Sequence, residues 1–199
     1  GFMVALGGCA TAPQGKGPHD FSVGIQKPEV VITVNKNATE LNAQITSAHG
    51  CKSGAENCIR VLKDNVAEIG FKLAGPPGWQ FSEMRIVPVA TESEKNACVT
   101  GTTRDIKACW LSPLQRAEFS ALAAGELDSA PLAPTQSGVI DLAALSCDAV
   151  DAFTLIDLNL LAQNYFYTVK VCNDSEEPAC LELDPPLEND GKGDGGMRN

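Results

Sequence analysis

The run Tyr165-Phe166-Tyr167-Thr168-Val169-Lys170-Val171 carries the clearest structural signal in the sequence. Tyrosine and valine occupy every second position and alternate with Phe166, Thr168 and Lys170. Aromatic and β-branched residues with a period of two predict a strand that turns one face toward a core. Cys172-Asn173-Asp174 follows at once and predicts a turn that closes a hairpin. The run therefore favours a protein built on antiparallel sheet.

Several other segments extend this pattern along the chain. Further strand-like runs, separated by turn-forming residues, lie at 29–34, 65–73, 79–81, 84–89 and 153–159. Helical signals are shorter: Ser112 and Pro113 begin a predicted helix that continues to residue 122, and residues 37–45 allow another short helical segment. We therefore predict a mainly β fold, an immunoglobulin-like antiparallel β-sandwich with one or two short helices in an insert.

Length and composition set the domain organisation. The chain has 199 residues, of which 44% are hydrophobic, enough for one core. We predict an N-terminal arm at 1–20 and a sandwich domain at 21–184 with an insert at about 92–148. The acidic, glycine-rich segment 185–199 is predicted to be a mobile tail.

Charge and motif content exclude several classes of function. A net charge of −10 disfavours nucleic acid as a partner, because binding to phosphates needs a basic surface. Only two histidines occur, and no hydrolase, metalloprotease, phosphate-loop or dinucleotide motif is present. We therefore expect a protein without enzymatic activity, catalytic residues, metal or cofactor.

Eight cysteines are the strongest indication of the compartment. This number in a chain of this size is typical of an oxidising environment, and no CxxC pair suggests a zinc or redox site. Three pairs are close in sequence and are the disulfide candidates: Cys51 with Cys58, Cys98 with Cys109, and Cys172 with Cys180. Each would close a short loop and stabilise the fold by about 2–3 kcal/mol. Other connectivities remain open at this point.

Cys9 and Cys147 are left over by that pairing. Leu6-Gly7-Gly8-Cys9 resembles a bacterial lipobox, in which the cysteine is acylated, and residues 10–18 read as a flexible tether. Cys9 is thus a lipidation candidate, with Cys147 as a free thiol. The alternative is a disulfide between Cys9 and Cys147. Both readings predict an exported protein that is periplasmic, associated with the outer membrane, or extracellular.

Five segments together resemble the small bacterial DP-EP family. They are residues 69–73, 78–81 with a Gly-Trp-x-Phe strand, 155–159 with an Asp-x-Asn turn, the tyrosine-rich 165–171, and 184–189 with a terminal Asp-Pro. The resemblance covers about half of the chain and implies a compact immunoglobulin-like sandwich. It implies no activity and supplies no catalytic residues. The chain departs from the family in its cysteines, its lipobox-like start and its insert.

Few residues outside these patterns suggest chemistry. His49 precedes Cys51 and would form a nucleophilic pair with a free thiol, although a disulfide from Cys51 to Cys58 is the simpler interpretation. Asp157-Leu158-Asn159 is interpreted as a turn motif. Trp79 and Trp110, with Tyr165, would form a sugar-binding platform if they were exposed together.

These observations predict a binding protein. The expected function is an accessory or structural subunit of a bacterial cell-envelope or surface assembly, in which the sandwich and the extended termini contact other protein subunits. A lipid anchor at Cys9 would add membrane attachment. The alternative function is an extracellular module that binds carbohydrate or captures a substrate, with Trp79 and Trp110 as its platform.

Overall fold

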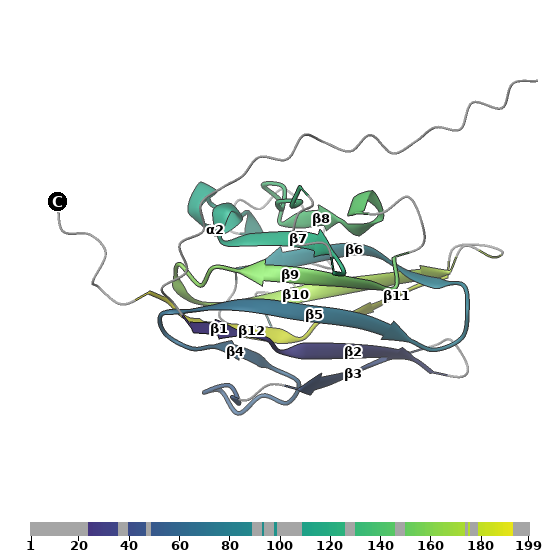
Figure 1. The fold of residues 1–199 in the computed structure, drawn as a ribbon, viewed down its shortest axis with the longest axis horizontal. Coiled ribbons are helices and arrows are strands. Elements are labelled where there is room, and N and C mark those ends of the chain that lie inside the picture. The colour runs from purple at the N-terminus through teal and green to yellow at the C-terminus, as the bar shows by residue number, and fades with distance from the viewer. Residues whose placement is uncertain are drawn as a thin grey trace, which may run out of the picture.

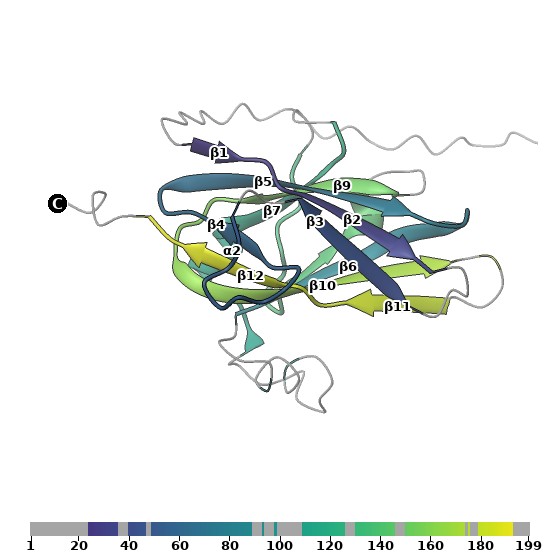
Figure 2. The same cartoon turned by 90° about the horizontal axis from the view of Figure 1, so that it is seen from below.

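The computed structural model describes residues 24–35, 40–46, 49–88, 93, 98, 109–125, 130–145, 150–173, 175 and 179–192. Two six-stranded sheets pack face to face and form a β-sandwich. Figure 1 looks onto the sheets, and Figure 2 shows the layer of β5 and β9 above the layer of β10 and β12. The expected mainly β sandwich is therefore confirmed.

The two sheets differ in strand order. The first has the order β3-β2-β5-β9-β7 with β1 beside β5, and its strands are β1 Gly24–Gln26, β2 Glu29–Val34, β3 Leu41–Thr46, β5 Asn65–Ala74, β7 Phe119–Ala123 and β9 Ala152–Asp157. The second has the order β4-β12-β10-β6-β8 with β11 beside β10, and its strands are β4 Ile59–Val61, β6 Trp79–Val87, β8 Val139–Asp141, β10 Ala162–Asn173, β11 Ala179–Leu183 and β12 Pro186–Asp190. The named helices of the described residues are short: α2 Pro113–Glu118 and the 3-10 helix η2 Leu142–Leu145.

Strand pairing is mixed, whereas wholly antiparallel sheets were expected. Strands β1 and β2 both run parallel to β5, and β4 runs parallel to β12. The remaining pairs between named strands in the described part of the chain are antiparallel. Pro28, which cannot donate to a ladder, separates β1 from β2, while its carbonyl accepts from Gly70 N at 2.9 Å. One segment interrupted at Pro28 thus follows the same side of β5.

Aromatic rings form the centre of the core between the sheets. Phe71 and Phe153 stack with ring centroids 4.6 Å apart, and Tyr167 meets Phe71 edge-on at 5.5 Å. Phe81 contributes a further edge-on contact to Phe153 at 5.0 Å. The alternating residues of the 165–171 run that were expected to face the core are all fully buried. Period two in the sequence therefore identified the buried face correctly.

Two helix predictions need correction. Ser112 caps α2 as expected, and Ser112 and Gln115 exchange hydrogen bonds in a capping box. The helix ends at Glu118, however, and residues 119–123 form β7 against β9. Residues 41–45 of the second helical prediction belong to β3, which ends at residue 46. In both segments pairing with a neighbouring strand overrides a weak local helical preference.

The predicted tail also begins too early. Residues 186–190 form β12, which lies between β4 and β10 in the second sheet, so the sandwich continues beyond residue 184. Leu187 is fully buried and explains why this acidic segment is ordered. The described part of the 92–148 insert supplies β7 to one sheet and β8 to the other, so the insert belongs to the sandwich body.

The three expected disulfides are all present. Cys51 and Cys58 have Cα atoms 5.9 Å apart, Cys98 and Cys109 5.5 Å, and Cys172 and Cys180 4.2 Å. The last pair occupies directly opposite positions of the β10–β11 hairpin. Disulfides in this number indicate an oxidising, non-cytoplasmic location. Cys9, Cys147 and the arm at 1–20 lie outside the described residues.

Within the described ranges, no helix has the length and apolar character needed to cross a membrane.

Two glycines with the same backbone conformation allow steric clash to be separated from backbone strain. Gly125 and Gly138 both have φ of +79°, but an added Cβ has open space at Gly125 and would lie 2.1 Å from the Ile86 carbonyl oxygen at Gly138. Gly125→Ala should lower the free energy of unfolding by about 1–2 kcal/mol through strain alone. Gly138→Ala should cost about 1–3 kcal/mol more. Urea denaturation of both variants measures the difference, and equal losses would contradict the clash.

Candidate functional site

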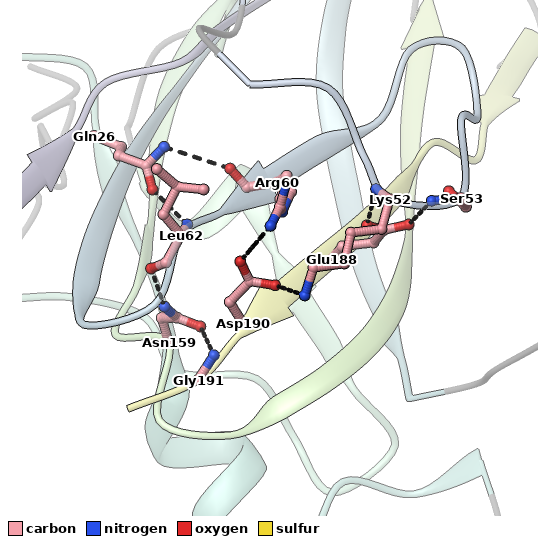
Figure 3. Close-up of polar contacts among 9 residues, drawn as sticks. All are labelled: Gln26, Lys52, Ser53, Arg60, Leu62, Asn159, Glu188, Asp190 and Gly191. Carbon is pink, nitrogen blue, oxygen red and sulfur yellow. Dashed lines mark hydrogen bonds and ion pairs between the residues drawn. The ribbon is translucent and has the colours of Figure 1, made fainter. Parts of the chain in front are cut away.

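On the outer face of β12, the Glu188 carboxylate binds the loop closed by the Cys51–Cys58 disulfide (Figure 3). Glu188 Oε2 accepts from the backbone N of Lys52 at 2.6 Å, and Oε1 accepts from the backbone N of Ser53 at 3.1 Å. These amides belong to the loop between Cys51 and Cys58. The paired amides are well suited to an ionised carboxylate. Glu188 therefore attaches the loop to the last strand of the sheet.

Asp190, two residues further along β12, forms the ionic part of this contact. Its Oδ2 accepts from Arg60 Nη2 at 2.8 Å and Nε at 3.2 Å, and its Oδ1 pairs with the Lys52 ammonium. Burial alone would raise the pKa of Asp190, but Lys52 and Arg60 outweigh it and hold that pKa below its usual range. The pKa of Glu188 is also lowered: hydrogen bonds from Ser53 and the Lys52 amide, with the Arg60 charge, outweigh its burial. Both carboxylates are thus held ionised.

Asn159 connects three strand ends on the other side of this network (Figure 3). Its Nδ2 donates to the carbonyls of Leu62 at 2.7 Å and Asn65 at 3.1 Å, and its Oδ1 accepts from Gly191 N at 2.8 Å. Asn159 N donates to Asp157 Oδ1 at 2.8 Å, which is the turn that the Asp-x-Asn motif predicts. The turn after β9 therefore positions the start of β5 and the end of β12.

A second pair of carboxyl groups lies buried beneath β12. Glu118 and Asp157 are both fully inaccessible, and Asn189 Nδ2 donates to Glu118 Oε1 at 2.9 Å and to Asp157 Oδ1 at 3.1 Å. Tyr165 donates its hydroxyl to Glu118 Oε2 at 2.7 Å, and Leu161 N donates to Glu118 Oε1 at 3.3 Å. One amide of the last strand thus bridges two buried acids.

The buried cluster of Glu118, Asp157 and Asn189 has fewer hydrogen-bond donors than acceptors. Among the described residues, Asp157 Oδ2 and Asn189 Oδ1 are buried and have no hydrogen-bond partner. Burial, with the nearby Glu118 charge, raises the pKa of Asp157 from 3.8 to about 8, and burial raises the pKa of Glu118 as well. The raised pKa favours the protonated form of Asp157 at neutral pH, and a proton on Oδ2 turns that unpartnered oxygen into a donor.

This buried cluster is suited to holding the fold together. Its acids are closed to a substrate because neither Glu118 nor Asp157 is accessible to solvent. Strongly perturbed acids often mark functional sites, but buried polar networks perturb pKa values in the same way. The contacts connect α2, β9, β10 and β12, so we assign the cluster to the cohesion of the sandwich.

A polar hollow lies on the outer face of the second sheet. It has a volume of about 430 Å³. The strands β6, β10 and β11 form its floor, and the Cys98–Cys109 disulfide and Trp110 form a wall. The residues that line it are Glu83, Arg85, Val87, Cys98, Cys109, Trp110, Ser137, Thr168, Lys170 and Glu182.

The two tryptophans do not form a common platform. Trp79 is 7% exposed and belongs to the core between the sheets, while Trp110 is half-buried and lines the hollow on the outer face. Tyr165 is fully buried and faces Glu118. The platform of Trp79 and Trp110 that the sequence suggested is therefore wrong. Trp79 begins β6 with its side chain on the inward face, like Phe81 two residues later.

The cysteine candidates near His49 form no reactive group. Cys51 is bonded to Cys58, so the thiol that a nucleophilic pair with His49 requires is absent. The sulfurs of this disulfide lie close to Glu188 in a grouping that resembles a metal site. Since both sulfurs are consumed by the disulfide, they are not thiolate ligands.

Sequence reasoning missed the two acidic pairs that organise β12. Glu118 ends a short helix, and Glu188 and Asp190 lie in a segment interpreted as tail. None of these three residues lies in a recognisable motif, although Leu187 and Asn189 alternate with Glu188 and Asp190 as in a strand.

No family model and no curated protein matches the chain, so the resemblance to the DP-EP family stays a prediction.

The protonated Asp157 predicts a loss of stability as the pH rises. In the unfolded chain this group loses its proton near pH 3.8, whereas the folded protein retains it up to about pH 8. Between these values unfolding releases a proton, so the free energy of unfolding falls with a slope of up to about 1.4 kcal/mol per pH unit. Asp157→Asn keeps Oδ1 and replaces the protonated Oδ2 with a permanent donor. Its stability curve should be flatter, and at pH 9 it should exceed that of the parent.

Asp151→Asn is the matched control because Asp151 is exposed at the start of β9. Thermal or urea denaturation from pH 4 to pH 9 should show little change in slope for this variant. A residual slope in Asp157→Asn is expected from Glu118, whose pKa is also raised. If Asp157→Asn is less stable than the parent at pH 9, the assignment of the proton is wrong.

Proposed function

We propose that the chain is a non-catalytic accessory subunit of a bacterial cell-envelope or surface assembly, and that a neighbouring subunit adds a strand to β3. The observation that carries the proposal is the β3 edge of the first sheet, which in the described part of the chain pairs with no strand other than β2. The disulfides support an exported protein, since they require an oxidising compartment. The lipobox-like Cys9 supports attachment to a membrane through a lipid anchor.

Strand β3 has the features of an edge that accepts another strand. Its six residues, Leu-Asn-Ala-Gln-Ile-Thr, contain no charge, proline or glycine, and they pair with β2 in one unbroken register. Within the described part of the chain, no strand pairs with its other side. It lies along the lower border of the sandwich in Figure 1. Natural proteins usually guard such edges with lysine, proline or a bulge.

The other sheet edges are better protected, and β11, whose far side also pairs with no described strand, carries the acidic Glu182. Leu132 bridges β7 through hydrogen bonds with Ala121, and β4 is only three residues long, with Gln26 bonded to the Arg60 carbonyl and the Leu62 amide. Strand β8 is also three residues long and ends in the charged Asp141. Strand β3 is therefore the long, uncharged exception among the described edges.

The backbone groups that would receive a partner can be identified. Asn35 N donates to the Glu40 carbonyl at 3.1 Å, so residues 35 and 40 are a hydrogen-bonded pair of the β2–β3 ladder. Antiparallel ladders alternate, and the register is continuous from that pair to the end of β3. The even-numbered amides of β3 therefore face β2. The amides of Ala43 and Ile45 face the open edge.

A different subunit is favoured over a second copy of this chain. Each copy has a net charge of −10, which opposes self-association and the approach of an acidic segment, while the uncharged edge places no like charge against a neutral or basic one. The incoming segment would extend the row of Ala43 and Ile45, which pack against the core, with apolar residues at alternate positions. The proposed partner is thus a neutral or basic extended segment of another envelope protein.

The proposed pairing predicts a position-specific contact in native cells. A benzoylphenylalanine at Gln44, whose side chain is exposed, should crosslink to one dominant envelope protein when the full chain is produced in its own cells. Ala43→Pro removes an outward N–H and places a ring at the open edge, so the adduct should be lost. Mass spectrometry of the envelope fraction identifies the adduct.

Three controls make this experiment decisive. The same crosslinker at the exposed Lys63 should not capture that protein, and Ala43→Val, which keeps the N–H, should retain the adduct at Gln44. The pair Asn42→Lys and Gln44→Lys, tested by co-purification, guards the edge without changing the backbone. A partner retained in both edge variants, an adduct only with another copy, or no adduct would each overturn the proposal.

A further inference from the structure

We propose that the hollow on the outer face of the second sheet binds a neutral saccharide through Thr168 and Trp110. This site is separate from the β3 edge and does not rest on the proposed function. It also differs from the platform that the sequence suggested, because Trp79 takes no part in it. Three features of the hollow support this assignment: the charge of its floor, an unpartnered hydroxyl and an aromatic wall.

The floor of the hollow carries balanced charge. Lys170 lies directly between Glu83 on β6 and Glu182 on β11, as the strand registers show. Arg85, opposite Thr168 in the register, forms an ion pair with Glu83 at 3.6 Å. Two cations and two anions leave no net charge among the described lining residues. The site therefore offers hydrogen-bond donors and acceptors in equal measure and gives no advantage to an anion.

Thr168 shows that the floor is incomplete without a ligand. Its side chain is on the outer face of β10, it is 6% exposed, and its Oγ1 has no hydrogen-bond partner among the described residues. A buried hydroxyl without a partner is unfavourable by about 1–3 kcal/mol. Thr168 lines the hollow, so a rotation about its Cα–Cβ bond would turn Oγ1 toward a bound ligand, whose hydroxyl group would supply the missing partner.

The Trp110 wall and the volume of the hollow indicate which class of ligand would fit. Trp110 is half-buried beside the Cys98–Cys109 disulfide and presents a large, amphipathic ring to the hollow. The C–H face of a sugar ring can pack on such a ring while its hydroxyls contact the polar floor. A volume of about 430 Å³ falls in the range of small-molecule sites. A neutral saccharide satisfies all three features.

Titration of the full chain with named sugars tests the proposal. Cellotriose, maltotriose and chitotriose are added to isotopically labelled protein, and we expect one of them to shift the NMR signals of Thr168, Arg85 and the Trp110 indole. Thr168→Val removes the unpartnered hydroxyl, so it should weaken binding about five-fold while leaving the fold as stable as the parent or more so. Trp110→Ala should abolish the shifts.

Thr154→Val is the matched control, because Thr154 lies on the outer face of β9 in the opposite sheet. It should bind the same sugar with unchanged affinity. Absence of shifts with all three sugars at millimolar concentration overturns the proposal. It is also overturned if only trigalacturonate or a tripeptide shifts these signals, or if Thr168→Val binds as tightly as the parent.

Discussion

The inner face of the last strand is anchored by a single amide, that of Asn189, which donates to Glu118 and Asp157 in a region closed to water. Two ionised carboxylates that share one donor would repel strongly in a low dielectric. The protein avoids this by keeping Asp157 protonated, which its raised pKa allows. The last strand is thus held from inside by the Asn189 amide and, through Glu188, by an ionised carboxylate from outside.

The two faces of β12 show how environment assigns the charge of chemically similar groups. Glu188 and Asp190 meet backbone amides, Arg60 and Lys52, and these donors favour the ionised form. Asp157 meets few donors and full burial, which favour the protonated form. Side chains alternate along β12. The ionised Glu188 and Asp190 therefore lie on its outer face, and Asn189, whose amide bridges the buried acids, lies on its inner face.

The sequence predicted the parts of this structure that depend on local pattern. Period two identified the buried face of β10, and short spacing identified all three disulfides. Prediction failed where a distant partner decides the outcome. Residues 119–123 contain good helix formers, but pairing with β9 makes them a strand. Glu118 has no local feature that reveals its bond to Tyr165, because that contact exists only after two remote elements meet.

Strand order has a consequence for how the protein folds. Strand β12 follows every other described strand in sequence, yet it lies between β10 and β4 and covers Glu118 and Asp157. Until β12 docks, both acids keep access to water and have no reason to hold a proton at neutral pH. The burial of these acids and the raised pKa of Asp157 therefore both depend on the docking of β12. Docking of this strand is a non-local step, because its partner β4 is far away in the sequence, and non-local pairing is slow.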